Sequence, residues 1–599
     1  MKHVISIMKE AMRAISEQKA IIRNVYLLWL LTLGYYIVRM LNPLLQSALL
    51  DGTATLFNDV PDYSLLLIGF VGILLSEGFL ALQNAKWGIL FTRTGNEIQI
   101  GIQSKIFDKL CRIPYSAFNT PKIYENIELV SGNYARYCSN FLAGRTLSSL
   151  IGTFISFVFT SSVLINIDPV IAGIVVCGNL FGIFKTWLEA HLNYYSTVEK
   201  MKERRYANAY NSPLFDRNTI KEVKVFGLMD YITRKWLVHT NKVNRKTMAY
   251  NSTFLLLDFV TYFIANAFTV TALILTARMI LAGETSIGTF VLVYSSSGSL
   301  IDTSGSLFGA LGQLKMASFY HTAYQEFMAM PDIEKDINSL DSKDKTDAPL
   351  DIVIEHLNYT YDGSDTKAID DLSLTIRQGE KIAIVGENGC GKTTLVALLN
   401  RLYSPDSGAI FLGGKPQEEQ LSLLRRQVST VFQDFGNYET SFRENIIMSD
   451  LEQDHSDEDI LLCASKTGID ERIQESVAGL DTPIGRFAEG GINLSGGEWQ
   501  KLAITRGLIR KFTKVLIMDE PNAALDPVAE ATIYKQVFDA IQDQTLILIT
   551  HRLGAIKYVD RIIVMDHGRI VEDGSHDDLM LKRGKYYDMY TAQAKWYEQ

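Results

Sequence analysis

The chain has 599 residues, enough for several folding units, and its 58 Lys and Arg against 67 Asp and Glu give a net charge of −9. This balance argues against a generally basic nucleic-acid-binding protein, so we expect no nucleic-acid partner. Five scattered cysteines without a CxxC pair exclude a disulfide framework. Residues 1–330 hold 50 charged side chains with a basic excess, whereas the 269 residues after them hold 75 with an acidic excess. A single soluble core is therefore excluded.

Residues 1–330 are predicted to form a helical membrane domain. Because a bilayer core of about 30 Å needs about 20 mainly apolar residues per helix, six stretches qualify as spans. They lie near residues 25–50, 63–91, 140–167, 169–192, 252–281 and 286–315. The fourth and sixth are weak by hydropathy alone, and charged residues such as Lys185 and Asp258 interrupt several. Such residues are expected near a helix end or facing an internal cavity.

Loop charge predicts the orientation of these helices. Five basic residues against two acidic ones precede the first stretch, and residues 196–250 hold 12 Lys and Arg against five Asp and Glu. Because basic loops stay on the cytoplasmic side, both termini are expected in the cytoplasm. The connections 92–139 and 193–251 keep a helical period, which predicts long cytoplasmic extensions of the helices.

After a polar linker, residues 331–350, the domain over 351–599 contains a phosphate-binding motif. A strand at 381–385 runs into GENGCGKTT and then into an apolar helix, which is the setting of a P-loop. Glycines let the backbone N–H groups wrap phosphates, Lys392 reaches the β- and γ-phosphates, and Thr393 binds Mg²⁺. The residues expected to bind nucleotide here are Gly386, Asn388, Gly389, Cys390, Gly391, Lys392, Thr393 and Thr394.

A second apolar strand, 515–519, ends in two carboxylates, Asp519 and Glu520. Its continuous apolar run is typical of a parallel strand covered on both faces. Asp519 is expected in the Mg²⁺ shell, and Glu520 is expected to polarise the water that attacks ATP. Together with the P-loop, this pair predicts an α/β domain that binds ATP and Mg²⁺.

The stretch from Leu494 to Glu498, LSGGE, predicts a second anion cradle. Ser495 supplies a hydroxyl, and Gly496 and Gly497 expose N–H groups at the start of a helix. One nucleotide does not need two cradles from one chain. Here the sequence resembles the ATP-binding cassette family, in which this signature faces the γ-phosphate held by the partner subunit's P-loop. Glu498 replaces the commoner Gln of the family and leaves the Ser/Gly cradle intact.

The resemblance assigns roles to four further residues. Tyr361 matches the aromatic that stacks on adenine, and Gln433 matches the glutamine that contacts Mg²⁺ and water. Asp526 matches the aspartate of the loop that crosses the dimer interface. His551 matches the switch histidine that contacts the γ-phosphate and, with Lys392, Gln433 and Glu520, completes the expected catalytic set.

With the membrane half first and the cassette second, the whole chain resembles an ABC exporter half-transporter of the type IV exporter fold. Such a chain must dimerise to complete its sites. Because Glu520 and the signature are both retained, a symmetric homodimer with two competent sites is expected. The expected location is a bacterial cytoplasmic membrane. Stretches 118–127 and 215–227 match the coupling segments that touch the cassettes, and 489–491 resembles the exporter loop that contacts them.

The cargo is predicted less directly. Cassette stretches 431–446, 494–502 and 520–530 resemble exporters of lantibiotics and related ribosomally made peptides. Fewer than 30 residues precede the first span, so the leader-cleaving peptidase domain of some relatives does not fit. A flippase for lipids or lipid-linked saccharides, a multidrug exporter, and a regulator without pumping remain alternatives. Asp258, Asp302 and the polar sixth stretch indicate either a wet cavity for polar or cationic cargo or close helix packing.

Overall fold

The computed structural model describes residues 12, 19–56, 62–120, 123, 126–127, 129–143, 146–332, 350–485, 489–520, 527–541, 543–551 and 555–597. The chain divides into two compact units. The first comprises Met1–Cys111 and Thr120–Pro331, and the second comprises Arg112–Asn119 and Asp332–Gln599. The short stretch Arg112–Asn119 therefore belongs with the C-terminal unit, although it follows a helix of the first unit in the chain.

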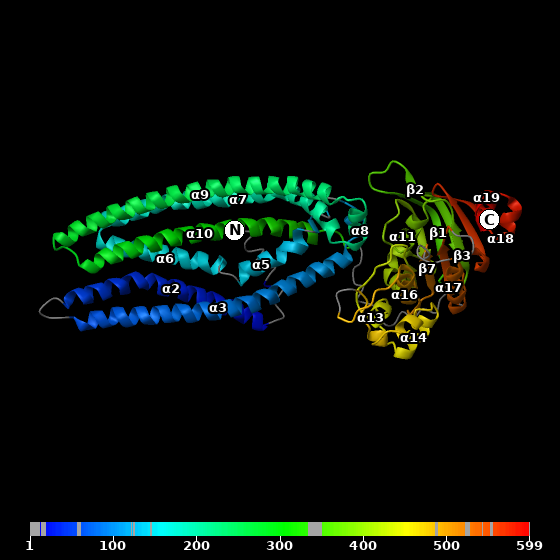
Figure 1. The fold of residues 1–599 in the computed structure, drawn as a ribbon, viewed down its shortest axis with the longest axis horizontal. Coiled ribbons are helices and arrows are strands. Elements are labelled where there is room, and N and C mark those ends of the chain that lie inside the picture. The colour runs from blue at the N-terminus through cyan, green and yellow to red at the C-terminus, as the bar shows by residue number, and fades with distance from the viewer. Residues whose placement is uncertain are drawn as a thin grey trace. The chain divides into compact units, whose positions relative to one another are not determined.

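The first unit is built from long helices (Figure 1). Its helices are α2 (Lys19–Thr55), α3 (Tyr63–Arg112), α5 (Ala135–Leu142), α6 (Thr146–Ile167), α7 (Pro169–Asn211), α8 (Arg217–Val225), α9 (Met229–Leu281) and α10 (Ile287–Met328). Four of them, α2, α3, α6 and α9, contain segments long and apolar enough to cross a membrane. Charged residues in α7 and the Ser- and Gly-rich sequence of α10 lower the hydropathy of these two helices. Their crossing stays a prediction.

Helices continue through the two long connections, as the helical period predicted. Helix α3 runs on to Arg112, α7 runs on to Asn211, and α9 begins at Met229. At a rise of 1.5 Å per residue, the 53 residues of α9 extend over about 80 Å, more than twice a bilayer core. Helices α7 and α9 pack along one another over much of this length (Figure 1).

The second unit contains two sheets. A four-stranded antiparallel sheet has the order β2-β1-β4-β5, and a six-stranded sheet has the order β10-β9-β3-β8-β7-β6. In the larger sheet only β10 runs antiparallel. The strands are β1 (Ile352–Thr360), β2 (Lys367–Ile376), β3 (Lys381–Val385), β4 (Ser407–Leu412), β5 (Lys415–Pro416), β6 (Val428–Val431), β7 (Val515–Asp519), β8 (Thr545–Ile549), β9 (Arg561–Asp566) and β10 (Arg569–Gly574).

Helices cover these sheets and form a separate helical part. They are α11 (Lys392–Leu399), α12 (Leu421–Gln427), α13 (Phe442–Ile447), α14 (Asp457–Ser465), α15 (Asp470–Gln474), α16 (Gly496–Leu508), α17 (Pro527–Ala540), α18 (His576–Lys582) and α19 (Lys585–Tyr597). Every residue of β7 and β8 is buried, which fits the continuous apolar run predicted for a central parallel strand.

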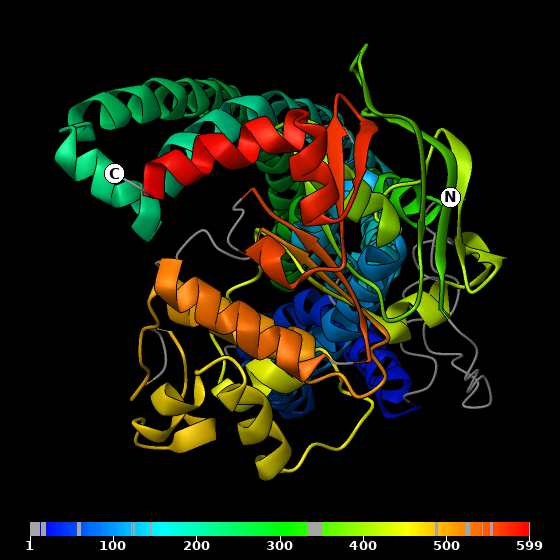
Figure 2. The same ribbon diagram turned by 90° about the vertical axis from the view of Figure 1, so that its right-hand side faces the viewer.

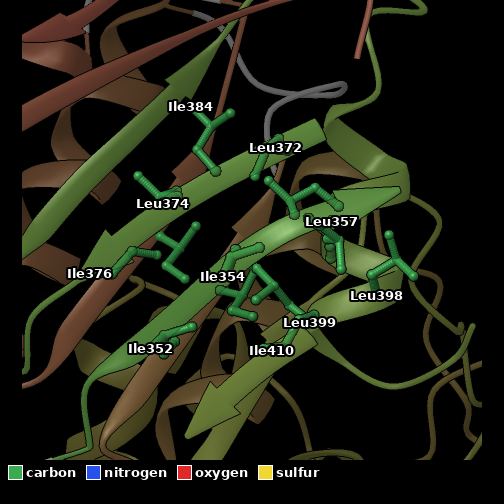
Figure 3. Packing of buried hydrophobic residues seen from close by; sticks show 14 of the residues in the cluster. Ile352, Ile354, Leu357, Leu372, Leu374, Ile376, Ile384, Leu398, Leu399 and Ile410 are labelled. Atoms are coloured by element: carbon green, nitrogen blue, oxygen red, sulfur yellow. The ribbon is translucent and has the colours of Figure 1, made fainter. Parts of the chain in front are cut away.

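One hydrophobic cluster joins both sheets to α11 (Figure 3). Ile354 and Leu357 of β1, Leu374 of β2 and Ile384 of β3 pack with Leu398 of α11 in this cluster. A second cluster lies among α13, α14, α15 and α16, and includes Leu494 of the signature. The P-loop is therefore held by the sheet cluster, whereas the LSGGE signature is held by the helical cluster.

Candidate nucleotide site and membrane cavity

The P-loop closes around the ammonium group of Lys392. This side chain is 5% exposed, and its Nζ donates to the carbonyl oxygens of Gly386 at 2.9 Å and Glu387 at 3.0 Å. Gly391 has φ of +107°, and a Cβ there would lie 2.5 Å from the carbonyl oxygen of Ala368, so this position requires glycine. The loop thus places a buried cation at the N-terminus of α11, the end of a helix that attracts anions.

The other loop residues differ in exposure. Asn388, Gly389 and Thr393 are exposed, whereas Cys390 is buried. The Cys390 Sγ lies 3.8 Å from the Lys392 Nζ. Burial raises the pKa of the Cys390 thiol, so its neutral form is favoured.

Asp519, at the end of β7, has the properties of a cation ligand. It is 1% exposed, and neither carboxylate oxygen has a hydrogen-bond partner that meets normal geometry among the described residues. Burial and then the charge of Glu520 raise the pKa of Asp519 to about 6, while the nearby Thr393 hydroxyl favours the charged form. A buried carboxylate without a partner is costly. Asp519 and Thr393 together fit a divalent cation, for which oxygen ligands of this kind are usual.

Glu520 and His551 leave neighbouring strands at the same edge of the sheet, because Asp519 of β7 pairs with Ile549 of β8. Their side chains meet, with the His551 Nδ1 lying 3.3 Å from a Glu520 carboxylate oxygen. Glu520 has φ of +41°, an uncommon conformation for a residue with a side chain, and its N–H donates to the Ile549 carbonyl at 3.0 Å. Backbone strain of this kind is concentrated at functional sites.

Gln433 lies in a turn after β6 and is exposed. Since Val431 of β6 pairs with Met518 of β7 in parallel, this turn leaves the sheet at the edge that carries Asp519. Asp526 lies outside the described residues.

Tyr361 follows β1 and is tied to the P-loop helix. Its hydroxyl hydrogen-bonds with the Thr394 hydroxyl at 3.0 Å, and its ring lies edge-on to Tyr359 and Tyr403, with centroids 5.1 and 5.6 Å away. The ring is 39% exposed, so part of it is open to a planar base.

The same aromatic group contacts the stretch Arg112–Asn119. The Asn119 amide donates to the Tyr403 hydroxyl at 2.8 Å, and the Tyr115 ring lies edge-on to Tyr403 at 5.6 Å. Asn119 falls within the first predicted coupling segment, of which residues 121–122 and 124–125 lie outside the described residues. Sequence reasoning missed this contact, because nothing in the pattern around Tyr403 singles it out.

The second predicted coupling segment contains α8. Phe215, Val225 and Phe226 flank or end this helix and are 82%, 78% and 67% exposed. These exposed apolar side chains fit a segment that meets another protein surface.

The signature begins α16 with a capping box. The Ser495 hydroxyl oxygen accepts from the Glu498 N–H at 3.3 Å, and the Glu498 carboxylate accepts from the Ser495 N–H at 2.6 Å. The Ser495 hydroxyl keeps its own hydrogen for donation, and Ser495 and Gly496 are exposed. Glu498 is therefore a helix cap that leaves the cradle open. The S-x-x-E spacing is a signal for this cap that sequence reasoning left unused.

The first unit encloses a cavity of about 630 Å³ among α2, α3, α5, α6 and α10. Aromatic rings form much of its wall, and amides and hydroxyls supply the polar groups. Its lining residues are Tyr35, Tyr36, Arg39, Trp87, Phe91, Tyr137, Asn140, Phe141, Thr146, Ser149, Ser306, Gly309, Ala310, Gln313 and Ala317.

A smaller cavity of about 330 Å³ shares Arg39 with the first and is also lined by Asp302. Arg39 and Asp302 form an ion pair, and Lys185 pairs with Asp258. The two carboxylates that the sequence placed in a wet cavity thus each have a basic partner, so neither offers an unpaired negative charge to cargo.

Comparison with known proteins places both units in one family. The family model described as "ABC transporter transmembrane region" matches residues 28–304, and the model described as "ABC transporter" matches residues 369–523. A solved structure of a bacterial Atm1-family ABC exporter with ATP bound superposes with a TM-score of 0.78, covering 96% of this chain and 99% of that one at 23% identity. This likeness shows the fold, a type IV exporter.

Curated relatives differ in cargo. An ATP-dependent lipid A-core flippase of Acinetobacter baylyi is 37% identical over 317 residues, about half of each chain (53%). The subtilin transport ATP-binding protein of Bacillus subtilis is 29% identical over 81% of this chain and 78% of its own length.

Proposed function

Because this chain belongs to the ABC transporters and joins a membrane domain to an ATP-hydrolysing cassette in one half-transporter, we propose that it acts as a homodimer that exports an amphipathic peptide. The peptide would leave a bacterial cytoplasm, with both termini of each chain on the cytoplasmic side. The family relationship supports ATP-driven export, and the membrane cavity supports the choice of cargo.

In the proposed ATP site each residue has a separate task. Lys392 neutralises phosphate charge at the N-terminus of α11, and Tyr361 presents its ring to adenine. Asp519 and Thr393, with Gln433 from the neighbouring turn, would hold Mg²⁺, which supplies charge neutralisation at the phosphates. Glu520 accepts a proton from the attacking water, while His551 lies against the Glu520 carboxylate and orients it.

The two anion cradles of one chain are held by different hydrophobic clusters, and this supports the dimer. The P-loop packs on the sheet cluster, and Leu494 beside the signature packs in the helical cluster. A second copy can supply its signature to the P-loop of the first copy. By two-fold symmetry, the signature of the first copy then meets the P-loop of the second. An intact signature and an intact Glu520 in one chain favour two equal sites.

The charge balance of the membrane cavities carries the cargo proposal. Among the described residues that line the two cavities, one basic side chain, Arg39, faces one acidic side chain, Asp302, so the charge sums to zero. An anionic glycolipid headgroup needs surplus basic side chains. A peptide segment with apolar side chains instead fits aromatic walls. Its backbone can meet the Asn140 amide and the amide N–H groups of Gln313, whose oxygen accepts from the Thr146 hydroxyl at 2.6 Å.

A flippase for lipid A-like lipids is the second candidate, favoured by the relative from Acinetobacter. The two are separated by ATPase assays of the purified dimer in nanodiscs with three probes: subtilin, lipid A and ethidium. We expect subtilin to stimulate turnover and Trp87→Ala to abolish that stimulation while sparing the basal rate. Stimulation by lipid A alone would replace the peptide proposal by the flippase, and stimulation by ethidium alone would indicate a drug exporter.

A further inference from the structure

The last helix of the chain, α19, lies beyond residues 369–523, the part matched by the ABC transporter family model. Its start is fixed by Glu572 of β10, whose carboxylate accepts from the N–H groups of Lys585 at 2.6 Å and Tyr586 at 3.0 Å. A Cβ at Gly584 would lie 1.9 Å from a Glu572 oxygen, so a side chain at this position would displace the carboxylate that caps the helix. Figure 2 shows α19 in red next to the strands of the same colour.

The first turns of α19 are anchored to the strand that leads into the P-loop. Tyr586 is fully buried in a cluster with Ala383 and Val385 of β3, and its hydroxyl bonds to the His576 Nδ1 at 2.7 Å. Lys585 adds a surface link, because its Nζ lies 2.7 Å from Asp566 and 3.5 Å from Glu387 of the P-loop.

Farther along the same helix, α19 contacts the switch histidine. The Gln593 amide donates a hydrogen bond to the main-chain carbonyl of His551. The His551 ring in turn lies against Glu520, at 3.3 Å. One helix therefore contacts β3 and the P-loop through side chains at its start and the main-chain carbonyl of His551 farther along.

We propose that α19 is a positioning element for ATP hydrolysis and that Gln593 is its positioning residue. Gln593 touches neither nucleotide nor the attacking water. It acts through His551: by fixing the carbonyl of that residue, it fixes the direction in which the imidazole leaves the backbone and hence its contact with Glu520. The anchored start of α19 gives this hydrogen bond a constant distance from the P-loop.

The test is steady-state ATPase kinetics of the full-length dimer carrying Gln593→Glu. The carboxylate has the size of the amide but no hydrogen to donate. Since one neutral hydrogen bond is lost, we expect kcat to fall by about two- to tenfold. The KM for ATP should stay within about twofold, because the P-loop and Tyr361 are untouched. Gln593→Lys, which keeps a donor, should restore most of kcat.

Thr591→Ala is the matched control, because among the described residues the Thr591 hydroxyl bonds within α19, to the carbonyls of Tyr587 and Asp588. It should leave kcat unchanged. Melting temperatures of all three variants should agree with the parent, which separates positioning from stability. The proposal is overturned if Gln593→Glu leaves kcat unchanged, if Thr591→Ala lowers kcat equally, or if Gln593→Glu raises KM alone.

Discussion

Arg39 of α2 and Asp302 of α10 form an ion pair of 2.5 Å that joins two helices of the membrane domain. The pair belongs to a polar seam between the two helices. The next contact lies seven residues along each helix, and the third lies five residues farther along α2 and seven farther along α10. The seam joins Arg39 to Asp302, Gln46 to Ser295, and Asp51 to Gly288. Charged side chains in a membrane domain are costly unless paired, so this seam defines how α2 and α10 align.

The ion pair predicts a charge-reversal experiment. Asp302→Asn leaves Arg39 unbalanced between the two cavities, and we expect peptide-stimulated ATPase to fall by at least about threefold while the basal rate is kept. The reversed pair, Arg39→Asp with Asp302→Arg, should recover most of the stimulation. ATPase assays in nanodiscs with subtilin measure both. Ser295→Ala is the uncharged control in the same seam. A reversed pair as inactive as Asp302→Asn would contradict the pairing.

Asp519 predicts a pH dependence of metal-assisted ATP binding. Its pKa of about 6 lies above the ordinary aspartate value of 3.8, so below pH 6 the folded protein holds this carboxyl in its neutral form. A cation needs the carboxylate, and Mg²⁺-dependent ATP affinity should therefore rise with pH and level off above about pH 6. Calorimetric titration with ATP from pH 5 to 8, with and without Mg²⁺, measures this.

The charge of Glu520 is the second cause of the raised pKa of Asp519, after burial. In Glu520→Gln the midpoint should consequently move to lower pH. The γ-phosphate of ATP titrates identically in both proteins and cancels from this comparison. An unchanged midpoint in Glu520→Gln would show that the observed titration belongs to the nucleotide and not to Asp519.

The sequence predicted best those features that depend on local backbone chemistry. The P-loop could be located because glycines, Lys392 and Thr393 must follow a strand in a fixed order, and the paired acids Asp519 and Glu520 had to end a buried strand. The structure adds the contacts between residues that lie far apart in the sequence. Arg39 lies 263 residues from Asp302, and no local pattern indicates that they meet.

The C-terminal helix was missed for a similar reason. Gln593 carries no charge and belongs to no motif. Its proposed role is visible only from its hydrogen bond to the carbonyl of His551, 42 residues earlier. Glu498 was recognised as a departure from the family pattern, but its role as a cap became visible only with the Ser495 hydrogen bonds. Spacing alone would have allowed that inference.

The burial of Cys390 predicts that its thiol reacts slowly with alkylating reagents and that bound ATP protects it. The thiol is 5% exposed and burial raises its pKa above the ordinary value, so at pH 7 little of the reactive thiolate is present. N-ethylmaleimide should inactivate the ATPase slowly, faster as the pH rises, and ATP should protect because it binds over the same loop. Cys390→Ser is the control and should resist. Full activity after complete alkylation of Cys390 would contradict the assigned position of the loop, since the Lys392 Nζ lies 3.8 Å from this sulfur.

Composite sites predict a difference between two kinds of mixed dimer. Lys392→Ala disables a P-loop and Ser495→Arg blocks a signature. If each site joins the P-loop of one copy to the signature of the other, a dimer with Lys392→Ala in one copy and Ser495→Arg in its partner keeps one intact site. A dimer with both changes in the same copy keeps none. Sites contained within one copy would reverse this result.

Counting occluded ATP gives a readout that does not depend on turnover. With Glu520→Gln in both copies to slow hydrolysis, differently tagged subunits are co-expressed and purified over both tags. We expect about one trapped ATP per dimer when the two changes are in different copies and close to zero when they share a copy, because a blocked signature prevents closure over the opposite P-loop. The reverse pattern would place each complete site within a single chain, and equal trapping in both arrangements would remove Ser495 from the site.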